Sequence, residues 1–329
     1  MTATPNKREL LTAGLGAAAF AGMPSLLFAQ SGAPARWAYL KPGFTVLMAQ
    51  YIQAKQLLKK NGADMSDPTE YTAVSTYYND FTAGNYDVCI GSWDVFAARY
   101  QAGVPIQLLC MITTADMISI ISGEKSVNKI TDLRGKTLAA LQSTGTYRMV
   151  SALLKETYGL QLGEDVIIQG VDNPAAAVTL VMANRADAGL SWEPNISLAF
   201  NRRPDLRSIF NAGEVYRQQT KHDLPYFGVA VRTDWAKKNA DQVKRIRQTF
   251  ADCIDGINAQ PGDAVKVAGG GAGYPAEVMT DAIASRRLRF QFGSMADAAQ
   301  RETVKKAGEF MVRNGLLKKQ IDDGFFVES

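Results

Sequence analysis

Three short stretches of the sequence place polar and aromatic side chains directly after an apolar run. Residues 92–94 (Ser-Trp-Asp) follow "CIG", residues 142–147 (Gln-Ser-Thr-Gly-Thr-Tyr) follow "LAAL", and residues 192–193 (Trp-Glu) follow "AGLS". Each stretch is typical of a buried strand that ends and a helix that begins. The first amide N–H groups of a helix lack partners inside it and carry partial positive charge. The three turns therefore predict a binding site at the ends of the strands.

The second turn is richer in small polar residues than the start of a helix requires. Ser143, Thr144 and Thr146 provide hydroxyl groups, and Gly145 allows the backbone to approach a ligand closely. We expect this turn to contact a ligand.

A simpler interpretation of the other two turns remains open. Ser92 would be only the N-cap of a helix, and Asp94 a first-turn acid that the helix dipole favours. Trp93 and Trp192 would be core residues, although a tryptophan directly before a helix at a strand end more often lies at a rim. The sequence leaves both interpretations open.

Residues that many enzymes and metal sites use are scarce. The single histidine, His222, lies in the polar segment "RQQTKHDLP", which argues against His-based metal sites and Ser-His-Asp triads. The "GGGAG" run at 269–273 follows a helix and lacks the Gly-Lys-Ser/Thr ending of a phosphate loop, so we interpret it as a helix stop. No pair of carboxylates suggests hydrolysis. We expect a protein that is not an enzyme and holds no cofactor or metal.

The composition sets outer limits on the fold and its partners. With 47% hydrophobic and 21% charged residues in 329, the chain is able to bury a sizeable core in two domains or one divided domain. The net charge of +4 is mild, and no basic run carries interleaved aromatic residues. We therefore expect no nucleic-acid partner.

Three cysteines stand apart in the sequence. Cys89 and Cys110 fall in expected buried strands and Cys253 in an expected helix, with no C-x-x-C spacing. They are interpreted either as free structural thiols or, for Cys89 and Cys110, as a disulfide between neighbouring strands.

The N-terminal segment has a composition of its own. Lys7 and Arg8 precede an apolar stretch that is rich in Gly and Ala, broken by Pro24, and followed by small residues. This order is typical of a secretory signal peptide, whereas a membrane anchor needs roughly 20 strongly apolar residues. We predict a signal peptide at 1–35, cleaved between about 29 and 35, and export to the periplasm. "NKRELLT" resembles a twin-arginine signal with Lys7 replacing the first arginine, so the export route stays open.

Behind this segment, apolar runs alternate with amphipathic stretches. The first series predicts strands at 35–40, 70–77, 86–91 and 105–112 and helices at 44–62 and 93–103. The second series predicts strands at 117–123, 136–141, 165–171 and 186–192 and helices at 129–135, 146–159, 174–185 and 194–202. A strand at 223–232 precedes a remainder that is almost wholly helical. Such alternation predicts an α/β fold with mostly parallel sheets covered on both faces.

Three segments carry a resemblance to a known family. They are residues 82–109 (TAGNYDVCIGSWDVFAARYQAGVPIQLL), 130–160 (ITDLRGKTLAALQSTGTYRMVSALLKETYGL) and 174–194 (PAAAVTLVMANRADAGLSWEP). In this order they resemble the nitrate, sulfonate and taurine (SsuA-like) group of ABC-transporter periplasmic binding proteins. This group also includes binders of thiamine-pyrimidine precursors.

The resemblance implies the type II fold of periplasmic binding proteins. Two lobes, joined by crossovers at 118–124 and 222–228, would close on a ligand between them. Lobe I would comprise 36–120 and 225–329, including the C-terminal helices, and lobe II would comprise 121–224. The resemblance further implies a monomer that docks transiently on the membrane permease of an ABC importer.

The cleft contacts of the family would fall on the turns described above and on the loop "YLKPGF" after the first strand. The residues assigned to ligand binding in this way are Lys41, Phe44, Ser92, Trp93, Asp94, Ser143, Thr144, Gly145, Thr146, Tyr147, Trp192 and Glu193. Many members have small or proline residues where this chain has Trp93-Asp94, which argues against a simple inorganic anion.

These residues predict a ligand with two different ends. Trp93 would supply an apolar or stacking surface, and Asp94 with Glu193 opposite would accept hydrogen bonds from ligand donors. Two acids in a closed cleft oppose a bare sulfonate unless Arg148 or Lys41 offsets them. We therefore expect a small organic solute (a sulfonate, a nitrogen compound or an aromatic carboxylate) with an anionic end and a donor end.

The alternative is a single-turnover, thiamine-pyrimidine synthase-like enzyme of the same fold group. Its cysteine-rich motif is absent from this sequence, and export would remove the chain from the cytosolic pyridoxal phosphate that such an enzyme uses.

Overall fold

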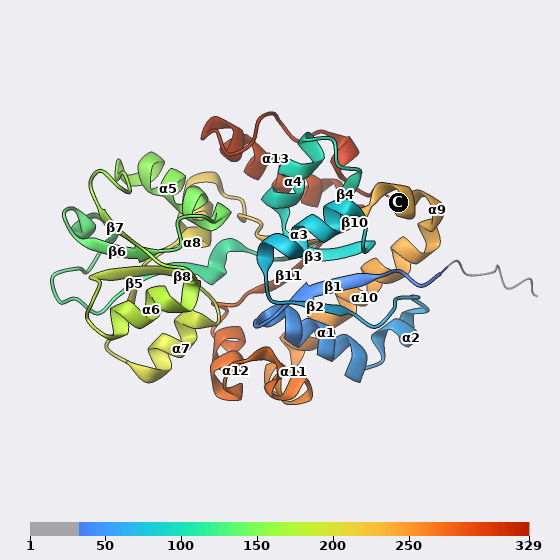
Figure 1. Cartoon of the computed structure of the whole chain (residues 1–329), viewed down its shortest axis with the longest axis horizontal. Helices are drawn as coiled ribbons and strands as arrows, with labels where there is room; N and C mark the ends of the chain where they lie inside the picture. The colour runs from blue at the N-terminus through green and yellow to red at the C-terminus, as the bar shows by residue number, and fades with distance from the viewer. Residues whose placement is uncertain (1–32, 329) are drawn as a thin grey trace, which may run out of the picture. The chain divides into compact units, whose positions relative to one another are not determined.

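The computed structural model describes residues 33–328, in which helices flank two β-sheets (Figure 1). The first sheet has the strand order β11-β4-β10-β3-β1-β2, and the second has the order β7-β6-β8-β5-β9. We call the parts built on these sheets lobe I and lobe II. Both belong to one compact unit that begins at Pro34.

Both sheets are mixed but contain a parallel set. The strands of lobe I are β1 (Trp37–Leu40), β2 (Thr69–Tyr71), β3 (Val88–Ser92), β4 (Ile106–Thr113), β10 (Phe227–Arg232) and β11 (Phe290–Ser294). Those of lobe II are β5 (Ile118–Ser122), β6 (Thr137–Ala140), β7 (Ile167–Gly170), β8 (Ala188–Trp192) and β9 (Arg207–Asn211). β1 pairs in parallel with β2 and β3, and β6 with β7 and β8. The strands that enter each lobe from the other, β10 and β5, pair antiparallel with their neighbours. The predicted α/β fold class is confirmed.

Helices cover both faces of each sheet. In lobe I they are α1 (Phe44–Ala54), α2 (Leu57–Asn61), α3 (Val74–Ala83), α4 (Trp93–Gln101), α9 (Thr233–Lys238), α10 (Ala240–Ala259), α11 (Pro261–Ala268), α12 (Ala276–Ala284) and α13 (Ala298–Arg313). In lobe II they are α5 (Gly145–Tyr158), α6 (Pro174–Met182), α7 (Asn195–Arg202) and α8 (Ala212–Thr220). Short 3₁₀ turns are η1 (Ala115–Met117), η2 (Ile130–Leu133), η3 (Gly269–Ala272) and η4 (Asp323–Phe325). Figure 1 shows α5 and α8 on one face of the second sheet and α6 and α7 on the other.

Local sequence signals fix both ends of α5. Oγ1 of Thr144 accepts a hydrogen bond from the N–H of Tyr147, as an N-cap does. Gly159 ends the helix in the left-handed conformation, with φ +58°. Met149 and Leu153, four residues apart, are both buried and hold one face of the helix on the core. The N-terminus of α5 is thereby fixed at the end of β6.

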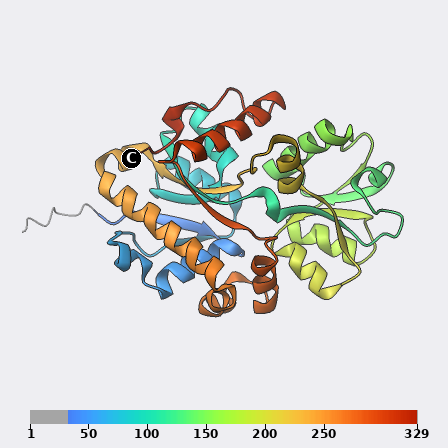
Figure 2. The same cartoon turned by 180° about the vertical axis from the view of Figure 1, so that it is seen from behind.

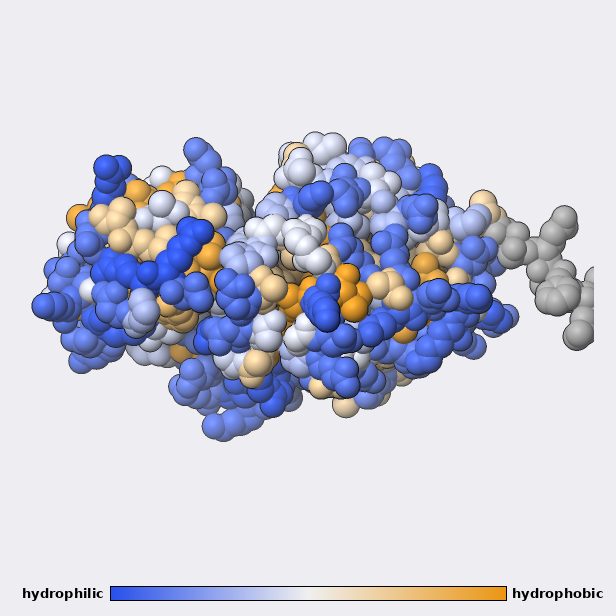
Figure 3. Space-filling model, turned by 90° about the horizontal axis from the view of Figure 1, so that it is seen from below, coloured by the Kyte–Doolittle hydropathy of each residue, from blue (hydrophilic) through white to orange (hydrophobic). Residues whose placement is uncertain are grey.

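The core on the α5 and α8 side of lobe II continues into lobe I. The ring centroids of Tyr216 on α8 and Phe310 on α13 are 5.7 Å apart in an edge-on arrangement. The opposite face, under α6 and α7, has a smaller core of its own that includes Val178 and Ile196. Because the large apolar side chains are enclosed, the face seen in Figure 3 is mainly hydrophilic, with apolar residues in small groups.

Some predicted elements differ from the structure. The strand expected at 70–77 is wrong beyond Tyr71, because Tyr77, Tyr78 and Phe81 form the buried face of helix α3. The β-branched residues Thr72, Val74 and Thr76, which are typical of strands, account for the wrong prediction. Two antiparallel strands, β9 and β11, and the helix α8 were not predicted, and β11 interrupts the part of the chain expected to be helical.

The chain passes between the lobes twice, and Figure 2 shows both passages from behind. The first passage lies at 114–117, between β4 and β5. It therefore precedes the crossover that was expected at 118–124. Residues 118–122 are already a strand of the second sheet, because their backbone pairs antiparallel with β8 and β9. The second passage lies at 221–226, between α8 and β10, close to the expected 222–228.

The three cysteines are buried and free. The disulfide interpretation is wrong, because Cys89 on β3 and Cys110 on β4 lie on strands that β10 separates. Burial raises the pKa of both thiols to about 12, which keeps them protonated at neutral pH.

The predicted signal peptide lies outside the described residues, apart from positions 33–35. Ala35 already belongs to the fold, because it is buried and its N–H donates to the carbonyl of Asp64 at 2.9 Å. Within residues 33–328, no helix has the length and apolarity that a membrane span requires.

Candidate functional site

The turn between β3 and α4 is held by a tyrosine of α3. The N–H of Ser92 donates to Oη of Tyr78 at 2.9 Å. A Cβ on Gly91 would lie 2.6 Å from the same oxygen, so glycine leaves the room that Tyr78 needs. Burial raises the pKa of Tyr78 well above its ordinary value, so its hydroxyl stays neutral. The start of α4 is therefore fixed at the end of β3.

Asp94 lies in the first turn of α4 and is partly exposed. Its Oδ1 accepts a hydrogen bond from Oγ of Ser92, and the backbone N–H of Val95 also contacts the carboxylate. Desolvation raises the pKa of Asp94, while these hydrogen bonds and the charge of Arg148 oppose part of the rise. A carboxylate perturbed in this way, at a surface between two lobes, is a candidate for a functional group.

The start of α5 in lobe II lies against Asp94 of lobe I. A Cβ on Gly145 would be 2.6 Å from Oδ2 of Asp94 and 3.9 Å from Nη2 of Arg148. The absence of a side chain at Gly145 thus allows the two lobes to approach. The structure brings together two predicted ligand residues and the arginine expected to offset the acid.

Thr146 contacts a tyrosine that the sequence analysis did not identify. Its Oγ1 and Oη of Tyr226 are 2.6 Å apart, and both side chains are buried. Burial raises the pKa of Tyr226, and the charge of Asp94 adds to the rise. Tyr226 lies in the second passage between the lobes. The only signal in the sequence was the aromatic pair Tyr226-Phe227 at the start of an expected strand.

The rest of the α5 turn remains accessible to different degrees. Ser143 and Arg148 are exposed, and Thr144 and Tyr147 are half-buried. Oγ1 of Thr144 also donates to the carbonyl of Leu141 at 2.9 Å, so this hydroxyl is occupied by local structure. Ser143 is the accessible hydroxyl of the turn.

Trp93 was expected to offer a stacking surface to the ligand, and the structure contradicts this prediction. This side chain is 1% exposed, and its Nε1 donates to the carbonyl of Pro225 at 2.8 Å. Its backbone N–H donates to the carbonyl of Tyr226 at 3.1 Å. As the first residue of α4, Trp93 packs back against the sheet and the second passage between the lobes. It ties the turn at Ser92 and Asp94 to that passage.

Replacing Trp93 with phenylalanine is expected to lower the free energy of unfolding by about 1–3 kcal/mol. The substitution leaves a cavity and an unpaired carbonyl at Pro225. Urea denaturation followed by circular dichroism measures the change. Trp235→Phe on α9, where the tryptophan is only half-buried, is the control. Equal losses in the two variants would contradict the assigned role of Trp93.

Glu193 does not offer a free acceptor, contrary to the prediction. Its side chain is fully enclosed, and Nε of Arg287 lies 3.2 Å from Oε1. Oε2 accepts a hydrogen bond from the N–H of Ser197 at 3.1 Å. Burial raises the pKa of Glu193, while Ser197 and Arg287 oppose part of the rise. The sequence had no signal for Arg287, because 94 residues separate the two partners.

Trp192, at the end of β8, is half-buried and packs against the core. Its carbonyl accepts a hydrogen bond from Nδ2 of Asn195 at 3.2 Å, and Oδ1 of Asn195 accepts one from Oη of Tyr274 at 2.9 Å. Tyr274 lies before α12 in lobe I, so this chain of contacts also joins the lobes. Trp192, like Tyr147, is a predicted aromatic residue that keeps an accessible part.

The loop before α1 offers fewer groups for ligand binding than the sequence predicted. Lys41 is exposed, and its Nζ forms an ion pair of 3.0 Å with Glu70 on β2. Phe44 is buried, with ring centroids 5.1 Å from Phe227 and 5.9 Å from Phe290. The aromatic contacts turn Phe44 into the core and away from a ligand.

The described part of the chain holds no grouping of three or more His, Cys, Asp or Glu side chains suited to a metal ion. The only histidine, His222, lies in the second passage between the lobes, where its N–H donates to Oγ1 of Thr220 at 3.2 Å.

Solved structures of low sequence identity share this fold. The periplasmic aliphatic sulphonate binding protein SsuA from Escherichia coli matches with a TM-score of 0.73 at 18% identity, over 89% of this chain and 91% of that one. The alkanesulfonate-binding protein SsuA from Xanthomonas axonopodis pv. citri, bound to MOPS, matches with a TM-score of 0.67 at 16% identity, over 88% and 96%. A Candida albicans protein with the generic periplasmic binding protein fold matches with a TM-score of 0.62 at 16% identity, over 89% and 93%.

At this identity the solved structures establish the fold, and a family model gives the membership. No curated protein matches the sequence. A model described as "ABC transporter, phosphonate, periplasmic substrate-binding protein" matches residues 53–253, which is more than half of the chain. The match favours a binding protein over the synthase-like alternative. The chain belongs to this family of periplasmic substrate-binding proteins, the components that bind the solute in ABC import systems.

Proposed function

We propose that the protein captures a small sulfonate or phosphonate that also carries a hydrogen-bond donor, such as an amino group. The observation that carries the proposal is the position of Asp94 against Gly145 and Arg148 of the opposite lobe. The acidic Asp94 and the basic Arg148 would lie on the two sides of one cleft. They suit a ligand that carries a cationic or donor group near Asp94 and an anionic group near Arg148. The SsuA structures support the sulfonate class, and the family model supports the phosphonate class.

The anionic end of the solute belongs at the N-terminus of α5. This helix has 14 residues, and its first amide groups favour negative charge. The hydroxyl of Ser143 and the guanidinium of Arg148 are exposed beside it. These groups together would hold three oxygens of a sulfonate or phosphonate.

The donor end of the solute belongs at Asp94. This carboxylate already contacts the N–H of Val95 at the start of α4, where an oxyanion would otherwise bind. A second anion there would meet an uncompensated like charge. An ammonium or amide N–H of the solute would instead complete the hydrogen bonds of Asp94.

Capture would occur by closure of the two lobes about residues 114–117 and 221–226. The solute would then pass to the membrane permease of the importer, on which a monomer docks transiently. The basic and apolar N-terminal sequence supports export by a signal peptide, through the general or the twin-arginine route.

The proposal is tested with a panel of six probes: taurine, ethanesulfonate, 2-aminoethylphosphonate, methylphosphonate, nitrate and benzoate. At a concentration of about 100 times Kd, binding adds roughly 2.7 kcal/mol to the stability. For a protein of this size each kcal/mol raises Tm by about 2–4 °C. We expect the two amino compounds to raise Tm more than their partners without an amino group.

Asp94→Asn should weaken binding of the amino compounds about tenfold or more, as measured by calorimetry. Because desolvation raises the pKa of Asp94, binding to wild type should weaken as the pH falls towards this pKa, at a higher pH than an ordinary aspartate would require. Asp234→Asn, in the first turn of α9, is the matched control. Tighter binding of ethanesulfonate than of taurine, with no effect of Asp94→Asn, would refute the assignment.

A further inference from the structure

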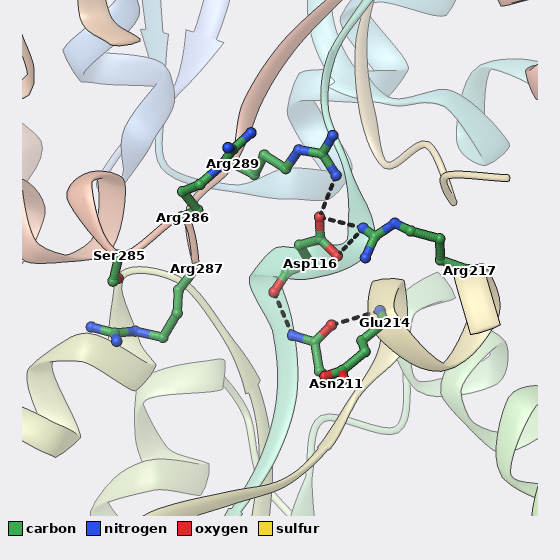
Figure 4. Close-up of a pocket in the computed structure, with 8 residues that line it drawn as sticks. All are labelled: Asp116, Asn211, Glu214, Arg217, Ser285, Arg286, Arg287 and Arg289. Carbon is green, nitrogen blue, oxygen red and sulfur yellow. Dashed lines mark hydrogen bonds and ion pairs between the residues drawn. The ribbon is translucent and has the colours of Figure 1, made fainter. Parts of the chain in front are cut away.

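A cavity of about 560 Å³ lies beside the two passages between the lobes (Figure 4). Its walls come from η1, from the start of α8 and from the segment between α12 and β11. The residues that line it are Asp116, Asn211, Glu214, Arg217, Ser285, Arg286, Arg287 and Arg289. It shares no lining residue with the turns at Asp94 and Gly145.

Four charged side chains around this cavity form one network. Nη2 of Arg217 lies 2.6 Å from Oδ1 of Asp116, and Nε of Arg217 lies 2.8 Å from Oδ1 of Asp223. Nη1 of Arg289 lies 3.1 Å from Oδ2 of Asp116 and 3.2 Å from Oδ1 of Asp223. Gln291 donates to the other oxygen of Asp223 at 3.0 Å. Each arginine thus contacts both aspartates. Asp116, Arg217, Asp223 and Arg289 are called the hinge network below.

The members of the hinge network come from both lobes and both passages. Asp116 lies in the first passage and Asp223 in the second. Arg217 belongs to α8 of lobe II, while Arg289 directly precedes β11 of lobe I. A Cβ on Gly213 would collide with Asp116, so the close approach of α8 requires glycine there. Any rotation of one lobe against the other must change distances within this network.

The network is electrically balanced and partly shielded from water. Its two cations and two anions have side-chain exposures between 12% and 37%, so salt screens them less than fully exposed pairs. The next arginine of the cavity, Arg287, is paired with Glu193 and Asp281. The two other charged residues of the lining, Arg286 and Glu214, carry opposite charges and form no ion pair within residues 33–328. The charges around the cavity are therefore nearly balanced, which favours a mechanical role over a bound anion. A connected network also contributes more than isolated surface pairs do.

We infer that the hinge network stabilises the arrangement in which the lobes approach, and thereby raises the affinity for solute from outside the cleft. The effect on solute affinity depends on the proposed function, whereas the effect on the arrangement of the lobes is present without solute. A protein whose binding-competent state is partly populated binds with an affinity reduced by that fraction. Residues that shift this population are positioning residues, although they do not touch the ligand.

The arrangement of the lobes is measured by double electron–electron resonance in the solute-free protein. Spin labels are attached to Val74→Cys in lobe I and Ile167→Cys in lobe II, whose native side chains are 57% and 60% exposed. The native cysteines are buried and leave the introduced thiols as the reactive ones. The variants Asp223→Asn and Arg289→Gln break the network. Arg289→Lys keeps a charge there, and Asp165→Asn breaks the pair Arg134–Asp165 within lobe II as a control.

Asp223→Asn and Arg289→Gln are expected to shift the distance distribution towards a more open population. Arg289→Lys should recover most of the wild-type distribution, and Asp165→Asn should leave it unchanged. Affinity for taurine or 2-aminoethylphosphonate should fall about fivefold or more in the two disruptive variants, through the population of the closed state.

The inference is overturned if the disruptive variants lower Tm but leave the distance distribution as in wild type, because the network would then be only structural. If no probe of the panel binds while the distribution still shifts, the proposed solute class fails and the hinge inference stands. Should Asp223→Asn not fold, Arg289→Gln and its rescue by lysine decide the result alone.

Discussion

Replacing Arg287 with methionine is expected to lower the free energy of unfolding by about 3 kcal/mol. The change leaves Glu193 as an enclosed carboxylate without its cation, and removing one partner of a buried pair typically costs about 3–5 kcal/mol. The side chain of Arg287 is itself 29% exposed, so water replaces part of the lost interaction and the expected loss lies at the lower end. Urea denaturation at pH 7 measures it.

The pH dependence gives this prediction a distinct signature. Burial already raises the pKa of Glu193, and removal of Arg287 raises it further. In the unfolded chain a glutamate titrates near about 4.3. Above that pH the folded variant must keep an enclosed negative charge or bind a proton, so its deficit grows as the pH rises through the folded pKa. The deficit should therefore be largest at pH 7 and small near pH about 4.

Two further variants separate charge from packing. Glu193→Gln in the Arg287→Met background should restore most of the stability at pH 7, because no enclosed charge remains. Arg286→Met, at the neighbouring exposed arginine, should have almost no effect, since Arg286 forms no ion pair with any residue in 33–328. A deficit that is the same at pH 4 and pH 7 would contradict the assigned role of Glu193.

Much of the fold was predictable because its signals are local. The N-cap at Thr144, the stop at Gly159 and the proline that opens α6 at Pro174 each act within a few residues. The apolar runs that became β3 and β8 are buried as expected. The unpredicted strands β9 and β11 pair antiparallel with β5 and β4, far away in the sequence, and carry weak apolar patterns of their own. Their formation depends on partners that local reasoning cannot supply.

The candidate site was predictable to the extent that it follows strand ends. Asp94 and Gly145 were each expected to contact the ligand because both lie where a helix begins after a strand, and the structure places Asp94 against Gly145. Glu193, which was expected opposite Asp94, is instead enclosed and paired with Arg287. The direction of a side chain at the first helical position was not predictable, which is why Trp93 was expected in the cleft and lies in the core. Tyr226 and Arg287 were missed because their roles arise only where distant segments meet.

Gly145 leads to the prediction with the largest expected effect on solute capture. A Cβ at this position would lie 2.6 Å from Oδ2 of Asp94, which is closer than carbon and oxygen can approach. Gly145→Ala therefore forces either the lobes apart or Asp94 away from Ser92 and the N–H of Val95. The test uses taurine or 2-aminoethylphosphonate, whichever binds wild type more tightly. Its affinity should fall about tenfold or more, a loss of about 1.4 kcal/mol or more in binding free energy.

The free energy of unfolding should change little, because the preference of a helix for alanine over glycine at the first residue of α5 offsets part of the cost of moving Asp94. Gly262→Ala is the matched control, since Gly262 lies near the start of α11 and a Cβ there would meet nothing within 4 Å. Calorimetry gives the affinities, and the spin-label distances show whether the lobes of the Gly145 variant stay apart without solute. Unchanged affinity in Gly145→Ala would mean that the solute does not require the contact between Asp94 and the start of α5, and the cleft proposed here would have to be placed elsewhere.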